Sequence, residues 1–444
     1  MSNPIFILEL NEFNDEFLRL AIKMHALPHL EKVLNYNRSL YKTSDRYNSG
    51  YLEPWVQWAS IHAGVSSKEH QAKNRDEMPE HFQMIWNKLA EEGFSSAVWG
   101  VINAPISQSD QIHCFTQDVW SKSESAYPKQ LNRYLNLGRY VGQHLNRLSS
   151  WRASLRAHVL KFYLKRAKLN AQVAWDIFKA GLQSFGPKPF VFMAYHEHAS
   201  VLKLLDMMKD KKPKVTFLCL NLLSYLEHHY WSQSDEFTPE MLFGLKHLDR
   251  LLGMIIDHNP EITFVMHNGL SQLNMNSEKG QYYYQPKHLY QFLIDMRIRF
   301  LSIDESIKPF WKMLFTCTDH CEETYQTLNQ ARLYGKPLFK IERSSSDKQL
   351  FVRLNVMDDI SNSTFFEFGG EQYSFDKYFE KGELITGRRV PMGTVYSNQI
   401  VFPDHIFNHN FNRYLLNYLN PEKYPLPKRE SEFKFEFEET LTVE

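Results

Sequence analysis

Short, almost wholly apolar runs followed by polar residues are the feature that most constrains the fold of this chain. A run without polar alternation is typical of a strand that is buried on both faces of a sheet. Five such runs are separated by helix-like or turn-forming segments: Ile5–Leu10, Ala97–Val101, Phe190–Ala194, Thr216–Leu220 and Ile262–Met266. This alternation predicts an α/β protein with a mostly parallel central sheet and helices on both faces.

The polar residues that end or follow these runs are the first candidates for a functional site. Ligands of open α/β sheets bind beyond the carboxyl ends of the strands. The residues at these positions are Glu9, Asn11, Asn103, His196, His198, Asn221, His267 and Asn268. His196 and His198 flank Glu197 and form a His-x-His pair, which can hold a metal ion but also arises by chance.

The length and the helix-like segments predict one main unit with an insertion. The chain has 444 residues, more than the usual domain of about 50–250, and parallel-sheet proteins reach such lengths through helical insertions. Residues 128–186 combine helix-like sequence with many cations and no strand pattern. We therefore predict a core in two parts, residues 1–127 and 187–420. We expect residues 128–186 to form an inserted basic helical lid, and residues 421–444 to form a mobile C-terminal tail.

The net charge and the cysteine content limit the possible binding partners and the cellular compartment of the protein. The net charge is zero, so the whole chain has no electrostatic footprint for nucleic acid. The cations of residues 128–186 belong either to solvated helix faces or to a surface for an anionic substrate, an acidic partner or a membrane surface. Four cysteines, no signal-peptide pattern and no apolar window of about 18 residues predict a cytoplasmic protein without a membrane span. The sequence leaves open whether the protein forms a homo-oligomer.

Five segments, in this order along the chain, resemble the alkaline phosphatase superfamily. Its members carry an acidic metal ligand after the first strand, then a nucleophile region and the motifs D-x-x-x-H, S-D-H-G and G-x-H-x-x-x-G. The corresponding segments are Ile5–Leu34, Glu53–Gly64, Asn221–Trp231, Met266–Gly269 and Gly387–Gly393. Details such as Leu10-Asn11-Glu12 also resemble a divergent bacterial subgroup, related to type I phosphodiesterases and sulfatases, whose function is unassigned.

The resemblance implies a metal site that several substitutions alter. Members of the family use two metal ions to activate a hydroxyl nucleophile. The matching positions offer as metal ligands Glu9, Asn221, His228 and His267. The last histidine of the family is replaced by Arg389, a fixed positive charge that would repel two zinc ions. We therefore do not expect a complete two-metal site, and one divalent ion, such as Zn, Mn or Mg, is left open.

The resemblance also assigns catalytic and binding roles. The nucleophile position aligns with Pro54 or, one place earlier, with Glu53. Glu53 would supply the attack or act as a base, while His267 and Arg389 would stabilise developing charge. The predicted substrate-binding residues are Asn11, Gln57, Asn268 and Arg389.

Three functions are compatible with these residues. The first is a hydrolase or transferase acting on a phosphate, phosphodiester or sulfate ester of an anionic substrate, such as a glycan, a lipid-linked group or a nucleotide-like molecule. The second is a non-catalytic binding or regulatory protein that kept the fold but lost the two-metal site. The third is transfer chemistry in cell-envelope polysaccharide assembly with a carboxylate base. Phosphate-binding G-x-x-x-x-G-K-[ST] and dinucleotide-binding G-x-G-x-x-G motifs are absent from the sequence.

Overall fold

A computed structural model describes most of the chain outside the segment around residues 136–178. The described residues are 3–43, 45, 52–72, 78–119, 121, 126–132, 135, 179–186, 188–232, 236–274, 281–304, 311–343, 348–356, 358–361 and 363–426. Most of the predicted lid at 128–186 and the tail beyond residue 426 lie outside this part, so both stay predictions.

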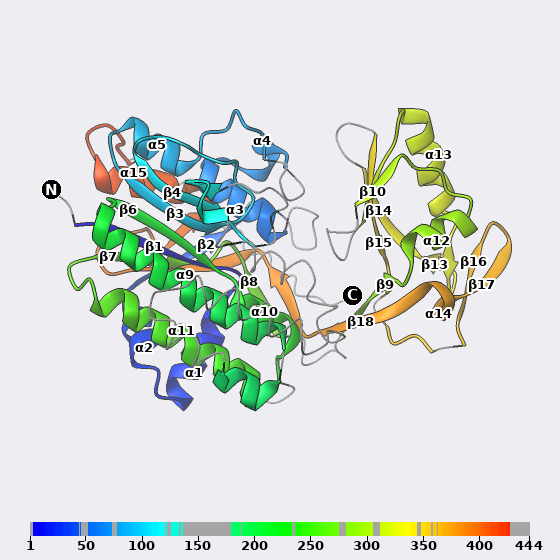
Figure 1. Cartoon of the computed structure of the whole chain (residues 1–444), viewed down its shortest axis with the longest axis horizontal. Coiled ribbons are helices and arrows are strands. Elements are labelled where there is room, and N and C mark those ends of the chain that lie inside the picture. The colour runs from blue at the N-terminus through cyan, green and yellow to red at the C-terminus, as the bar shows by residue number, and fades with distance from the viewer. Residues whose placement is uncertain are drawn as a thin grey trace.

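A mixed sheet forms the centre of the larger lobe (Figure 1). Among the described residues its strands follow the order β21 (His405–Phe407), β2 (Asn37–Lys42), β20 (Met392–Ser397), β7 (Thr263–His267), β1 (Ile5–Leu10), β6 (Val215–Leu220), β3 (Ser96–Val101), β4 (Ile112–Gln117) and β5 (Ala126–Tyr127). The strands from β7 to β4 are parallel, whereas β20 and β5 are antiparallel to their neighbours. The prediction of an α/β fold with a mostly parallel sheet is confirmed.

Helices cover both faces of this sheet, as Figure 1 shows. One face carries α1 (Asp15–Met24), α2 (Pro28–Leu34), α9 (Pro189–Lys211), α10 (Leu222–His229) and α11 (Pro239–Asp257). The other carries α3 (Pro54–Ala63), α4 (Ser67–His70), α5 (Ile85–Glu91) and α15 (Phe411–Leu419), which follows the short 3-10 turn η2 (Asn408–Asn410). Successive residues of β1 enter opposite cores, which explains why its sequence is a continuous apolar run.

One of the five predicted strands is wrong. The run Phe190–Ala194 lies in α9, which begins with Pro189 at its first position after Lys188. Proline suits the first turn of a helix because it lacks a backbone N–H, and the helix continues well beyond the apolar run. A short apolar run alone does not distinguish a buried helix from a buried strand. His196 and His198 consequently lie inside a helix rather than at a strand end.

A second lobe, residues 281–385, lies beside the first and has its own hydrophobic core (Figure 1). Its sheets are β10 (Ser302–Asp304), β11 (Trp311–Leu314), β15 (Gln349–Leu354) with β14 (Phe339–Arg343), and β13 (Lys336–Pro337), β12 (Arg332–Leu333), β16 (Phe365–Phe368) with β17 (Glu371–Ser374). Its helices are α12 (Leu289–Asp295), α13 (Thr318–Leu328) and α14 (Phe375–Tyr378). The predicted core segment 187–420 did not separate this lobe, because its strands are short and none of them has an apolar run of more than three residues.

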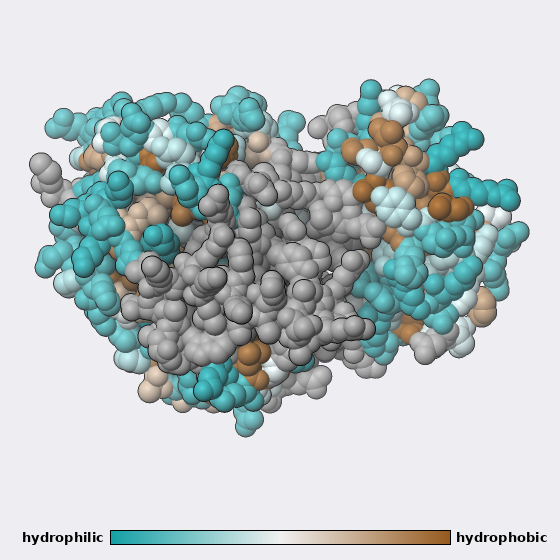
Figure 2. Space-filling view, in the orientation of Figure 1, coloured by the Kyte–Doolittle hydropathy of each residue, from teal (hydrophilic) through white to brown (hydrophobic). Residues whose placement is uncertain are grey.

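Two antiparallel ribbons connect the main sheet to the second lobe, the first next to the main sheet and the second within the lobe. β8 (Ser271–Asn274) pairs with β19 (Gly387–Val390), and β9 (Gln281–Pro286) pairs with β18 (Phe379–Ile385). Hydrophilic side chains dominate much of the coloured surface in Figure 2, and apolar ones gather on part of the second lobe. Of the helices in the described residues, none combines the length and apolar character that a membrane crossing requires.

Candidate functional site

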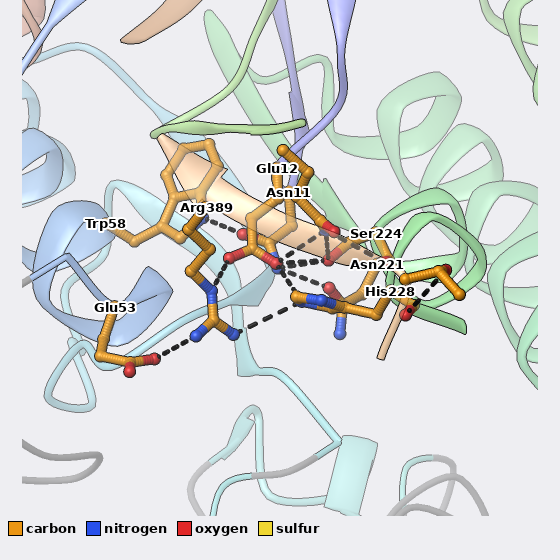
Figure 3. Close-up of polar contacts among 10 residues, drawn as sticks. Asn11, Glu12, Glu53, Trp58, Asn221, Ser224, His228 and Arg389 are labelled. Carbon is orange, nitrogen blue, oxygen red and sulfur yellow. Dashed lines mark hydrogen bonds and ion pairs between the residues drawn. The ribbon is translucent and has the colours of Figure 1, made fainter. Parts of the chain in front are cut away.

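The site is built around Glu12, which lies two residues beyond the end of β1. Its backbone has a left-handed φ of 57°, a conformation that is uncommon for residues other than glycine. The Glu12 side chain is 1% exposed and accepts hydrogen bonds from α10. Ser224 Oγ donates to Glu12 Oε2 at 2.7 Å, and His228 Nε2 lies 2.9 Å from the same oxygen (Figure 3). A buried carboxylate requires such partners.

Arg389 joins Glu12 to the start of α3. It lies on β19, opposite Gln272 of β8. The Arg389 Nε group donates to Glu12 Oε1, and Nη1 donates to Glu53 Oε2 at 2.7 Å. Its Nη2 atom lies 3.4 Å from His228 Nε2. Figure 3 shows the guanidinium between the two carboxylates, and its side chain is 28% exposed. A guanidinium has five N–H groups, so it retains donors beyond these two carboxylate bonds.

The two carboxyl groups have pKa values that are shifted in opposite directions. Burial raises the pKa of Glu12, but Arg389 and His228 outweigh burial and hold this pKa well below its usual range. Burial also raises the pKa of Glu53, and here the nearby Arg389 offsets only part of the effect, while the Glu12 charge adds to it. Glu12 is therefore the ionised carboxylate, and Glu53 retains its proton to a higher pH. Such divergence of neighbouring carboxyl groups is typical of acid–base sites.

Asn11 and Asn221 hold each other next to this ion network. The Trp58 indole Nε1 donates to Asn11 Oδ1 at 2.8 Å, and Asn11 Nδ2 donates to Asn221 Oδ1 at 2.6 Å (Figure 3). Trp58 lies on α3, the helix whose N-cap residue is Glu53. The amide chain thus ties the end of β1 to both α3 and α10.

Two of the predicted site residues lie apart from this cluster, in the core on the other face of the sheet. Glu9 is paired in register with His267, and Glu9 Oε1 lies 2.9 Å from His62 Nε2 of α3. The His267 ring stacks on Phe411 with their centroids 4.4 Å apart. Burial, with a smaller effect from His62, lowers the pKa of His267 to about 3. Glu9 and His267 contact His62 and Trp58 of α3, respectively, whereas Glu12, which lies in the turn after β1, contacts α10.

Gln57 and Asn268, predicted to bind substrate, are engaged in structural hydrogen bonds. Gln57 Nε2 donates to Asp45 Oδ2 at 2.6 Å, and Gln57 Oε1 accepts from Asn408 Nδ2 at 2.8 Å. Asn268 Nδ2 donates to a backbone carbonyl just after β1, and its Oδ1 accepts a backbone N–H of β20, both at 2.7 Å. Both side chains are fully buried. The structure therefore brings together Glu53, His228 and Arg389, with Asn11 and Asn221 beside them.

Glu12 and Ser224 are the site residues that the sequence analysis did not identify. The family pattern directed attention to Glu9, the acid inside the strand. The useful signal was the position of Glu12 beyond the strand end, at the edge where ligands of parallel sheets bind. Ser224 lies four residues before His228, a spacing that places both side chains on one face of a helix.

The described residues do not fit the metal centre that the family resemblance implies. Across the described ranges, no group of three or more His, Cys, Asp or Glu side chains is arranged to hold a metal ion. The guanidinium of Arg389 lies between Glu12 and Glu53, and a fixed cation there would repel a divalent ion. The candidate ligands Glu9 and His267 lie on one face of the sheet, and His228 lies on the other. We therefore assign no chemical step to a metal.

Comparison with known proteins gives similarity in fold only. No family model matches the sequence, and no curated protein matches it. Among solved structures, human ectonucleotide pyrophosphatase/phosphodiesterase 5 is 9% identical with a TM-score of 0.48, covering 94% of each chain. The murine protein is 10% identical with a TM-score of 0.47, covering 96% of this chain and 97% of its own.

A phosphonoacetate hydrolase from Sinorhizobium meliloti, solved in complex with phosphonoacetate, is 12% identical with a TM-score of 0.43, covering 94% of this chain and 95% of its own. These proteins belong to the alkaline phosphatase superfamily, the family that the five sequence segments resemble. At identities of 9–12% and TM-scores of 0.43–0.48 the similarity decides nothing about the chemistry of this chain.

Proposed function

We propose that this site hydrolyses or transfers a phosphate, phosphodiester or sulfate ester of an anionic substrate without a metal ion. One observation carries the proposal: Arg389 bridges an ionised carboxylate, Glu12, and a carboxyl group with a raised pKa, Glu53. Arginine suits the planar oxygens of phosphate and sulfate, and a carboxyl group that retains its proton can act as an acid.

The charges of the cluster explain how an anion could bind there. Glu12 and Arg389 offset each other, so the charge of the site depends on Glu53. An anionic ester at the remaining N–H groups of Arg389 would raise the pKa of Glu53 further, because like charges disfavour ionisation. Binding of the substrate would thus favour the protonated form of Glu53, the form that the reaction needs.

The reaction then proceeds by displacement at phosphorus or sulfur. Water, or an acceptor hydroxyl in a transferase, forms a bond to the central atom while the bond to the leaving oxygen breaks. The leaving oxygen takes the proton of Glu53, and the proton that the attacking water or hydroxyl loses restores Glu53. Arg389 stabilises the charge on the equatorial oxygens, and Glu12, His228 and Ser224 keep the guanidinium in place.

A panel of aryl phosphates, phosphodiesters and sulfates, assayed in excess chelator, tests this function. We expect turnover of at least one ester class without added metal. The Glu53→Gln variant should lose about 100-fold or more in kcat, because general acid catalysis contributes roughly 10²–10⁴-fold. The control for Glu53→Gln is Glu80→Gln, because Glu80 is exposed. Gln57→Glu would not serve as a control, because Gln57 is buried. Turnover that is absent in chelator, whether or not a divalent metal restores it, would contradict the proposal.

A second function, binding without turnover, is favoured by one feature of α3. The first position of this helix, where the family's hydroxyl nucleophile aligns, holds Pro54, which has no group able to attack. In that case the protein would bind phosphate or sulfate esters through Arg389 and release them unchanged. Calorimetry with non-reacting esters, with Arg389→Leu as the comparison, separates the two functions when it is combined with the assay panel.

A further inference from the structure

Glu197 supports the site from the neighbouring helix α9. Its Oε1 atom accepts the backbone N–H groups of both Asn221 and Leu222, each at 2.7 Å. Glu197 is 8% exposed. Asn221, the N-cap residue of α10, makes no side-chain capping bond of its own. The first N–H groups of a helix need partners from outside it, and at α10 a carboxylate from another helix provides them.

Helix α10, whose first turn Glu197 holds, carries the contacts on which the candidate site depends. Asn221 accepts the side-chain amide of Asn11. Ser224 and His228, one and two turns further along α10, both contact Glu12. A small shift at the start of α10 would therefore move every one of these contacts together.

We propose that Glu197 is a positioning residue, which sets the start of α10 and so fixes the hold of Asn221, Ser224 and His228 on Asn11 and Glu12. Glu197 touches neither Arg389 nor Glu53 in any contact that the structure describes, so it acts through α10 and not on a substrate. Its kinetic consequence rests on the proposed function, but its structural consequence does not.

The Trp58 indole offers a direct readout of this arrangement. Trp58 Nε1 donates to Asn11, and the Asn11 amide donates to Asn221, whose backbone N–H is bound by Glu197. The Trp58 indole N–H signal therefore responds to changes at the far end of this chain of hydrogen bonds. Proteins labelled with ¹⁵N-tryptophan and ¹⁵N-leucine give the Trp58 indole and the Leu222 amide signals in one spectrum. Burial raises the pKa of Glu197 to about 7, so spectra at pH 8 observe mainly the carboxylate.

Three variants separate positioning from general damage. Glu197→Gln retains an oxygen acceptor at the same reach, whereas Glu197→Asp withdraws it by one methylene. Asp210→Asn alters an exposed acid of the same helix and serves as the control. We expect Glu197→Asp to shift both the Leu222 amide and the Trp58 indole signals, and Glu197→Gln to retain the Trp58 signal near its wild-type position. Asp210→Asn should leave both signals in place.

An unchanged Trp58 signal in Glu197→Asp, or equal shifts in the Gln and Asp variants, would overturn the inference. Where the wild type turns over an ester, we also expect kcat of Glu197→Asp to fall on the order of 100-fold, as displaced catalytic groups can cause, and Glu197→Gln to restore most of it. If no ester is turned over, the proposed function fails, while the two signals still decide whether Glu197 positions the site.

Discussion

At the scale of single residues, the pairing of Arg389 with Glu12 is the interaction on which the site depends most. Glu12 is almost wholly buried, and removing one partner of a buried ion pair typically costs about 3–5 kcal/mol because the other charge is left without compensation. We expect Arg389→Leu to lower the free energy of unfolding by an amount of that order. Urea denaturation at pH 7 measures this loss.

The double variant Glu12→Gln/Arg389→Leu provides the control for that measurement. It removes the buried charge together with its partner, so we expect it to be more stable than Arg389→Leu alone. A double-mutant cycle then isolates the coupling between the two side chains. Equal stability of Arg389→Leu and the wild type would show that Arg389 does not compensate the charge of Glu12.

The sequence alone identified some of the residues in this cluster. Glu53, His228 and Arg389 were identified because each lies in or beside a segment that resembles a family motif, and the structure places them within one network. Glu9 was chosen because the acidic ligand of the family aligns with it, and the pattern gave no role to Glu12, which lies in the turn after β1. Only the register of β1 with β7, which follows from the assembled sheet, places Glu9 opposite His267.

At the scale of elements, the ribbon of β8 and β19 brings Arg389 to the site, and Gly387 allows its close approach. A Cβ atom at Gly387 would lie 2.3 Å from Gln272 Oε1 and 2.5 Å from the backbone oxygen of Glu227. We expect Gly387→Ala to push β19 outward and destabilise the protein by about 1–3 kcal/mol, the usual cost of overpacking. Weaker binding of the anionic ligand should accompany this loss.

Gly269→Ala is the matched control, because a Cβ there makes contacts no closer than 3.4 Å. Thermal unfolding and calorimetry of both variants measure the difference. If Gly387→Ala were as stable as Gly269→Ala and bound ligand equally well, the close packing of β19 would not be needed to place Arg389.

The elements themselves were predictable where burial left a strong pattern. β1, β3, β6 and β7 coincide with continuous apolar runs because each strand is covered on both faces. α9 shows the limit of this rule, since its apolar start reads as a strand until the longer helix is seen. The strands of the second lobe left a weaker signal, because a strand such as β16 alternates exposed and buried residues.

At the scale of the whole molecule, the second lobe contributes charge to the site of the first. Arg353 on β15 lowers the pKa of Glu53, against the larger rise caused by burial. If Glu53 acts as the acid, activity falls as the pH rises through its pKa in the folded protein. Removing the Arg353 charge raises this pKa, so we expect Arg353→Gln to move the fall in activity to higher pH. The pH dependence of kcat measures this shift.

Lys340→Gln is the control for this prediction. Lys340 pairs with Arg353 in register on the adjacent strand β14, and its replacement removes the same charge from the same lobe. We expect a smaller shift from this variant, because Lys340 is not among the charges that alter the pKa of Glu53 most. Equal shifts would mean that the net charge of the lobe, and not the position of Arg353, sets the effect.

The proposal that Arg389 takes the place of metal ions is tested most directly by a crystal structure of the wild-type protein grown with excess zinc, with anomalous diffraction recorded at the zinc edge. We expect the guanidinium of Arg389 to lie between the carboxyl groups of Glu12 and Glu53, with no anomalous peak in that space. A zinc peak bound by these carboxyl groups, with Arg389 displaced from them, would contradict the account.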